Sequence, residues 1–171
     1  NNINVENKVC IDLGASTGGF TDVLIKRGAK KVYSIDVGTN QLHEKLKKNK
    51  KVLNLEKINA RYIAKDMINE LIDLLVCDVS FISLKKVIFP NLYLLKNKST
   101  IIVLIKPQFE SNKNETKKGI IKDIQIHKRI CEEIKKWFEF ECNCEVVNII
   151  ESPIKGPKGN MEFLLTAKYQ K

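Results

Sequence analysis

Three charged side chains in this sequence stand where an apolar run of strand length ends or begins. Asp78 and Lys106 each follow such a run directly, and Glu162 directly precedes one. A lysine beside carboxylates in a partly dry cleft has its pKa pulled two ways, because desolvation lowers it and the negative charges raise it. Each residue taken singly is more often a solvated charge at a strand end. Their shared position at one edge of a sheet would favour a catalytic group that moves a proton.

A glycine-rich turn follows the apolar run Val9–Leu13 and reads Gly-Ala-Ser-Thr-Gly-Gly-Phe-Thr from Gly14 onward. Glycines at a strand-to-helix turn let the backbone approach a ligand closely. The phosphate-binding loop pattern fails here because Phe20 stands where that loop needs a lysine. The dinucleotide fingerprint also fails, because three residues separate Gly14 from the next glycine. We therefore exclude a nucleotidase and a dinucleotide-dependent enzyme.

Two carboxylates accompany this turn and indicate which ligand it binds. Asp12 lies two residues before Gly14, where it would repel a pyrophosphate but attract an ammonium or sulfonium group. Asp36 ends the next apolar run, where it can accept hydrogen bonds from ribose hydroxyls. The alternative is that both acids only cap turns. Together with the glycines at the carboxyl ends of neighbouring strands, they favour S-adenosylmethionine, which has a ribose, an ammonium and a sulfonium but no phosphate.

The elements that must position these residues alternate between strand-like and helix-like spacing. Between the first six apolar runs, apolar residues recur with helical spacing. In one of these stretches, from Leu84 to Leu95, we expect Pro90 to kink or divide the helix. This pattern predicts an α/β fold with a mostly parallel sheet and helices on both faces. The last two runs have only a Gly/Pro-rich loop between them and should be antiparallel. The predicted strands are Val9–Leu13, Val32–Ile35, Val52–Leu55, Leu74–Cys77, Thr100–Ile105, Val146–Ile150 and Phe163–Ala167.

Length and composition set outer limits on the function. The 171 residues suit one domain, which we place at residues 1–171, and the net charge of +10 suits a polyanion such as RNA or a lysine-rich composition alone. The longest apolar run, Ile101–Ile105, is far shorter than the roughly 20 residues that span a bilayer. We expect a cytoplasmic protein. A zinc site can be drawn from His127, Cys131, Cys142 and Cys144, but without a Cys-x-x-Cys pair we expect no metal.

Four motifs resemble the TlyA, or hemolysin A, family of FtsJ-like S-adenosylmethionine-dependent RNA methyltransferases. They begin at Asp12, Cys77, Lys106 and Ser152, and read DLGASTGGFTD, CDVSFISL, KPQFE and SPIKGPKGNMEF. The resemblance implies a Rossmann-like fold with a seven-stranded sheet and an antiparallel last strand. It also implies methyl transfer to a ribose 2′-OH of ribosomal RNA, at a cytidine in TlyA relatives.

The resemblance assigns roles to residues that match the family's motifs. Of a Lys-Asp-Lys-Glu catalytic tetrad it supplies Asp78, Lys106 and Glu162. The family's first tetrad lysine and its N-terminal S4-type RNA-binding domain have no match here, and Lys8 is a poor substitute. We therefore expect cofactor binding with weak or no methylation by this chain alone. The predicted cofactor residues are Asp12, Gly14, Ala15, Ser16, Gly18, Gly19, Phe20, Asp36, Val37, Asn59 and Asp78, and the predicted RNA contacts are Lys113, Lys117, Lys118, Lys155 and Lys158.

Three alternatives remain. The chain could be an RNA-binding module with this fold and no activity. The hemolysin label suggests a membrane-lytic protein, but no strongly amphipathic or spanning helix is evident. Base N-methylation favours an Asn/Asp-Pro-Pro-aromatic loop after the fourth strand, whereas this chain has Asp78-Val79-Ser80-Phe81.

Overall fold

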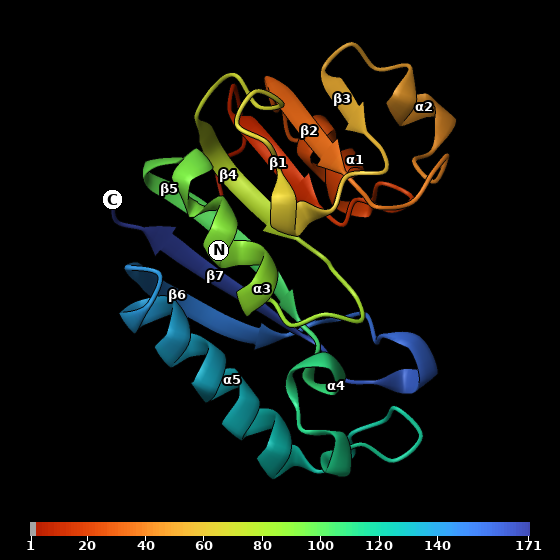
Figure 1. The fold of residues 1–171 in the computed structure, drawn as a ribbon, viewed down its shortest axis with the longest axis vertical. Helices are drawn as coiled ribbons and strands as arrows, with labels where there is room; N and C mark the ends of the chain where they lie inside the picture. Colours follow the sequence, from red (N-terminus) through yellow and green to blue (C-terminus); the bar gives the residue numbers. More distant parts are fainter. Residues whose placement is uncertain (1–2) are drawn as a thin grey trace.

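The computed structural model describes residues 3–171, apart from the side chains of Lys113 and Pro157. One twisted sheet contains seven strands, with helices packed around it (Figure 1). The strands are β1 Val9–Leu13, β2 Lys31–Ile35, β3 Val52–Leu55, β4 Ile72–Cys77, β5 Leu95–Ile105, β6 Cys144–Glu151 and β7 Phe163–Tyr169. The α-helices are α1 Gly19–Lys26, α2 Glu44–Lys47, α3 Lys85–Ile88, α4 Pro107–Glu110 and α5 Ile124–Phe140.

The strand order is β3-β2-β1-β4-β5-β7-β6. Neighbouring strands from β3 to β5 pair in parallel, and β7 runs antiparallel between β5 and β6. This confirms the predicted α/β fold, including its antiparallel last strand. The order reverses between β1 and β4, the place where open α/β sheets bind ligands.

The two faces of the sheet bury separate apolar layers. Leu24 of α1 packs with residues of one face such as Cys10 and Val32. On the other face, α3 and α5 contribute Ile88 and Phe138 to the larger core. In Figure 1, α5 runs along β6, the strand at the edge of the sheet. The strands β1, β2 and β4 are thus covered on both sides, which explains their nearly continuous apolar sequences, whereas the edge strand β3 is partly exposed.

The helical predictions need three corrections. Between β3 and β4 the described chain forms only a 3₁₀-helix, η1 Ala60–Tyr62, and not an α-helix. The predicted stripe after β4 splits into α3 and a second 3₁₀-helix, η2 Phe89–Leu94, because Pro90 lacks the N–H that an α-helix would need there. Leu95 therefore begins β5 instead of ending a helix. The polar, lysine-rich segment after α4 also contains a short 3₁₀-helix, η3 Lys113–Glu115.

Strand register brings the candidate residues to one edge. Leu13 pairs with Ile35 of β2 and with Cys77 of β4, so the chain leaves all three strands at the same level. Ile105 pairs with Phe163, which places Lys106 next to Glu162. No helix in the described part of the chain is long and apolar enough to cross a bilayer.

Candidate active site

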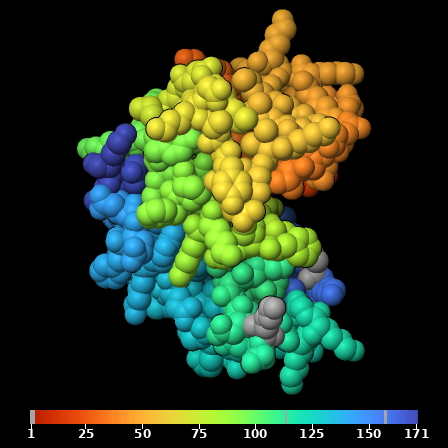
Figure 2. Space-filling model, in the orientation of Figure 1, coloured from red at the N-terminus to blue at the C-terminus, as the bar shows by residue number. Residues whose placement is uncertain are grey.

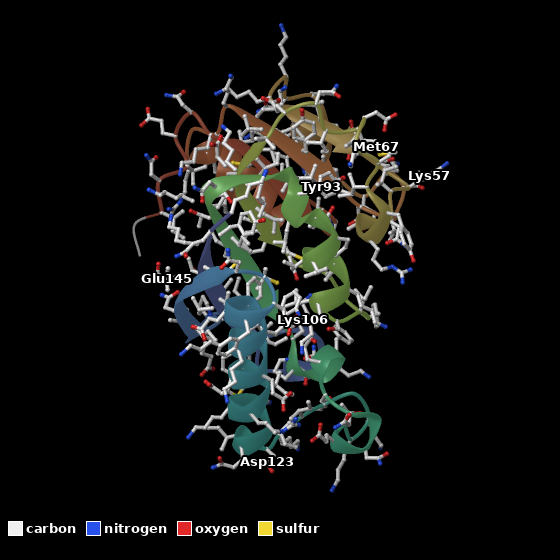
Figure 3. All side chains as sticks on the ribbon, turned by 60° about the vertical axis from the view of Figure 1, so that its left-hand side comes forward. Lys57, Met67, Tyr93, Lys106, Asp123 and Glu145 are labelled. Atoms are coloured by element: carbon white, nitrogen blue, oxygen red, sulfur yellow. The ribbon has the colours of Figure 1, made fainter. Side chains whose placement is uncertain are left out.

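Lys106 is the buried centre of an ionic cluster in which Asp78 stays partly exposed. It is 8% exposed, and its Nζ lies 2.6 Å from Oδ1 of Asp78 in an ion pair. The same Nζ donates a hydrogen bond to Ser80 Oγ at 2.8 Å. Lys106 is extended, with φ −113° and ψ 96°, as expected of a residue that precedes a proline. Figure 3 shows Lys106 near the middle of the molecule, beside α4.

Glu162 completes the cluster from the start of β7. It is 5% exposed, and burial raises the pKa of its carboxyl, while the charge of Lys106 partly offsets that rise. A Cβ added to Gly156 would collide with Oε1 of Glu162, so that glycine makes room for the carboxylate. The structure thus brings Asp78, Lys106 and Glu162 together, as the sequence predicted.

A cleft of about 420 Å³ opens beside this cluster. In Figure 2 the surface is indented on the right, between the yellow segment near residue 60 and the green segment near residue 80. Six of the predicted cofactor residues line the cleft: Gly14, Ser16, Asp36, Val37, Asn59 and Asp78. Apolar side chains form part of its wall, among them Ile58, Ile82 and Val87. The volume is within the range of small-molecule sites, about 300–1,000 Å³.

Asp36 joins the glycine turn to the segment after β2. Its Oδ2 accepts a hydrogen bond from Ser16 N at 2.8 Å, and its Oδ1 accepts one from Gly38 N at 2.7 Å. Gly14 has φ +81°, and a Cβ there would lie 2.8 Å from the backbone oxygen of Asp78. Only glycine therefore allows the turn to pack this closely against the Asp78 loop.

Five predicted cofactor residues do not line this cleft. Asp12 is 1% exposed and faces α1, where its Oδ2 accepts a hydrogen bond from Thr21 Oγ1 at 2.7 Å. Burial raises its pKa to about 7. The five predicted cofactor residues outside the cleft lining are Asp12, Ala15, Gly18, Gly19 and Phe20. Their contact with a cofactor stays a prediction, which the geometry of this cleft does not support.

The five lysines predicted to contact RNA lie in two loops, residues 111–118 and 152–160, which come together beside the cluster. Asn160 accepts a hydrogen bond from Ile121 N and donates one to Gly119 O, and Lys158 Nζ reaches Lys118 O. The side chain of Lys113 lies outside the described part of the structure. The other predicted RNA contacts are all exposed: Lys117, Lys118, Lys155 and Lys158.

Sequence reasoning missed three residues around the cluster. Ser80 accepts a hydrogen bond from Lys106. Its position two residues after Asp78 was the only sequence feature that could have indicated this role. Phe81 is 90% exposed with φ +64° and contacts the ring of Phe109, which no local pattern foretells. Glu110 accepts hydrogen bonds from the loop after β4; its spacing of four residues from Lys106 was a weak hint.

Two further expectations concern Lys8 and metal binding. Lys8 precedes β1 and lies at the amino end of the sheet, whereas the cluster lies at the carboxyl end, so Lys8 cannot complete a tetrad. Within residues 3–171, no three potential metal ligands come together, and all five cysteines are free thiols.

Comparison with known proteins decides the family. A family model described as FtsJ-like methyltransferase matches residues 1–169. The chain belongs to the FtsJ-like methyltransferase family. It is 48% identical over 165 residues to "Hemolysin A" of Brachyspira hyodysenteriae, covering 95% of this chain and 68% of that protein. It is 38% identical over 169 residues to the 16S/23S rRNA (cytidine-2′-O)-methyltransferase TlyA of Mycobacterium tuberculosis, covering 98% and 63%.

Solved structures agree with this FtsJ-like assignment. A hemolysin candidate from Streptococcus thermophilus superposes with a TM-score of 0.95 at 38% identity, covering 99% of this chain and 62% of that one. An S-adenosylmethionine-dependent methyltransferase candidate from Listeria monocytogenes, at 16% identity and a TM-score of 0.67, shows the shared fold alone. The FtsJ-like chain spans 58–68% of the length of the curated relatives it matches.

Proposed function

We propose that this chain is the catalytic domain of an enzyme that transfers a methyl group from S-adenosylmethionine to a ribose 2′-OH of ribosomal RNA. The observation that carries the proposal is the buried Lys106, held by Asp78 and coupled to Glu162 at the mouth of the cleft. The names of relatives from Mycobacterium tuberculosis and Campylobacter jejuni specify cytidine-2′-O methylation of rRNA, which makes cytidine the expected target.

The cleft fits S-adenosylmethionine. Asp36 keeps a lone pair on each carboxylate oxygen after binding Ser16 and Gly38, so it can also accept hydrogen bonds from ribose hydroxyls. The apolar side chains of Ile58 and Val87 suit the faces of an adenine ring. When bound, the cofactor supplies a methyl group on a sulfonium, which needs only a well-placed nucleophile.

Lys106 prepares that nucleophile. Its Nζ is paired with Asp78 and donates a hydrogen bond to Ser80, which leaves one position on the nitrogen for a further oxygen. For the transfer step Lys106 acts as the free amine: two N–H groups point to Asp78 and Ser80, and the nitrogen lone pair holds the 2′-hydroxyl in line with the methyl group and takes its proton as the new O–C bond forms. Asp78 and Glu162 stabilise the resulting ammonium. Alignment of two bound reactants supplies much of the remaining acceleration.

The surroundings of the cluster suit RNA. The lysines of the two adjoining loops are exposed and can neutralise phosphates. Phe81 presents a solvent-exposed ring at the rim of the cleft, on backbone that a bulky side chain rarely adopts. Single-stranded nucleotides are commonly recognised by stacking on such rings. These features support an RNA nucleotide as the methyl acceptor.

The test incubates ribosomal subunits with methyl-labelled S-adenosylmethionine and either the chain alone or the chain joined to an S4-type RNA-binding domain. We expect 2′-O-methylcytidine in the nucleoside digest, with the joined protein much more active. A label on the base would support N-methylation instead. No label with either protein, while RNA is still bound, would support the RNA-binding module without activity.

A further inference from the structure

The loop between β4 and α3 forms one wall of the cleft and carries part of the lysine cluster. Its residues Asp78 to Ile82 all line the cleft. Most of this loop has no regular secondary structure, and at Phe81 the backbone is left-handed, with φ +64°. Such backbone is unfavourable for a bulky residue and persists only where neighbouring contacts impose it. The loop therefore needs external attachments to keep its shape.

Besides the backbone hydrogen bond from Asp78 N to Leu13 O, one short segment, residues 106–110, supplies side-chain contacts along the whole loop. At the first end of the loop, Lys106 holds Asp78 and Ser80. At the other end, Glu110 Oε2 accepts a hydrogen bond from Ser83 Oγ at 2.6 Å, and its Oε1 accepts one from Leu84 N at 2.6 Å.

Between the two ends, the ring of Phe109 contacts that of Phe81, with centroids 5.1 Å apart. Lys106 and Glu110 are four residues apart across α4, so one helical turn clamps both ends of the loop.

Burying the Glu110 carboxylate costs desolvation free energy, which argues that its hydrogen bonds to the loop are needed to hold the loop in place. Burial raises the pKa of its carboxyl, while hydrogen bonds from Ser83 and Leu84 and the charge of Lys85 lower it again. Both carboxylate oxygens of Glu110 accept hydrogen bonds from the loop, from Ser83 and Leu84, and not from the residues of the ionic cluster. Ser83 Oγ already accepts a hydrogen bond from Lys85 N at the start of α3, so the helix does not depend on Glu110 for a side-chain cap.

We propose that Glu110 is a positioning residue that fixes the residue 78–84 loop over the cofactor and, through Ser80, sets the direction of Lys106. It touches neither reactant. The proposal rests on cofactor binding in the cleft but not on the identity of the RNA target. Its ligand in the test is S-adenosylmethionine itself.

The experiment measures S-adenosylmethionine affinity by calorimetry for the wild-type chain, Glu110→Ala and Glu110→Gln. Alanine should weaken binding about tenfold or more, the effect of losing roughly one charge-assisted hydrogen bond. Glutamine should restore affinity to within about threefold, because its amide can accept from Leu84 N and donate to Ser83 Oγ. Glu133→Ala, at an exposed carboxylate of α5, should bind like the wild type.

Two further measurements separate positioning from general stability. Amide hydrogen exchange in Glu110→Ala should accelerate at residues 79–84 and not in the β-sheet. If Glu110→Ala does not fold, Ser83→Ala removes only one of the two hydrogen bonds and should still weaken binding several-fold. Wild-type affinity in Glu110→Ala, or in the Ser83 variant used in its place, would overturn the proposal, as would a glutamine variant as weak as alanine. A wild-type chain that does not bind S-adenosylmethionine would refute the proposed cofactor instead.

Discussion

Replacement of Asp12 by asparagine should remove a loss of stability that the wild-type protein suffers as the pH rises. Asp12 is 1% exposed between the sheet and α1. Its Oδ2 binds Thr21, and within the described residues its Oδ1 has no hydrogen-bond partner. Burial is the main reason that its pKa rises from 3.8 to about 7, and the charges of Asp78 and Asp36 add to it.

The direction and size of the effect follow from these two pKa values. The folded protein keeps the proton up to about pH 7, whereas the unfolded chain loses it near pH 4. Between those values the folded state binds more protons, so its stability falls as the pH rises. A difference of about three pKa units corresponds to about 4 kcal/mol, which is fully present only below the unfolded pKa of 3.8 and is nearly lost by pH 7.

Urea unfolding at pH 5, 6 and 7 provides the assay. The free energy of unfolding of the wild type, minus that of Asp12→Asn, should fall by about 2–3 kcal/mol from pH 5 to pH 7. Thr21 can still donate to the asparagine oxygen, so the variant should fold. Asp66→Asn, at an exposed carboxylate, is the control and should leave this difference flat. Parallel profiles for wild type and Asp12→Asn would refute the reasoning.

Three shorter predictions concern the site. Gly14→Ala should lower S-adenosylmethionine affinity at least tenfold in calorimetry, since left-handed backbone costs a side chain about 1–2 kcal/mol and the added Cβ meets the Asp78 backbone. Gly156→Ala should displace the Glu162 carboxylate, so methyl transfer in a filter assay should fall about tenfold or more while cofactor affinity stays within about twofold. Neutralising the five loop lysines should weaken RNA binding, and the slope of log affinity against log salt concentration should become less steep by up to about four. An unchanged slope would mean that these lysines do not contact RNA phosphates. The residues are Lys113, Lys117, Lys118, Lys155 and Lys158.

Much of the fold could be predicted from the sequence because the information is local. The apolar runs marked all seven strands, and Pro107 fixed the extended backbone of Lys106. The parallel register then places Gly14, Asp36 and Asp78 at one edge without further assumptions. The helices were predicted less well, because short 3₁₀ segments such as η1 lack the repeated apolar spacing that identifies an α-helix.

The direction of Asp12 could not be predicted from its distance to Gly14 alone. Alternate residues of a strand face opposite sides of the sheet, and Asp12 shares its side with Ser34, its register partner on β2. Thr21 of α1 forms hydrogen bonds with both side chains, so the three residues make a buried polar cluster between α1 and the sheet. That arrangement is decided by how α1 packs on the sheet. The clamp by Glu110 joins residues 26 and 27 positions apart and is equally invisible to local patterns.

Lys106→Ala tests the central claim, that the buried lysine moves the proton of the methyl acceptor. The variant is compared with the wild type, each joined to an S4-type domain, for S-adenosylmethionine affinity and for 2′-O-methylcytidine formed on ribosomal subunits. Loss of general acid–base catalysis predicts a fall in methyl transfer of about 10²–10⁴-fold. Cofactor affinity should fall by about tenfold at most, because the variant also releases Asp78 and Ser80 in the wall of the cleft, so the loss of transfer at saturating cofactor isolates the role of the lysine in catalysis. Methyl transfer at the wild-type rate would contradict the account.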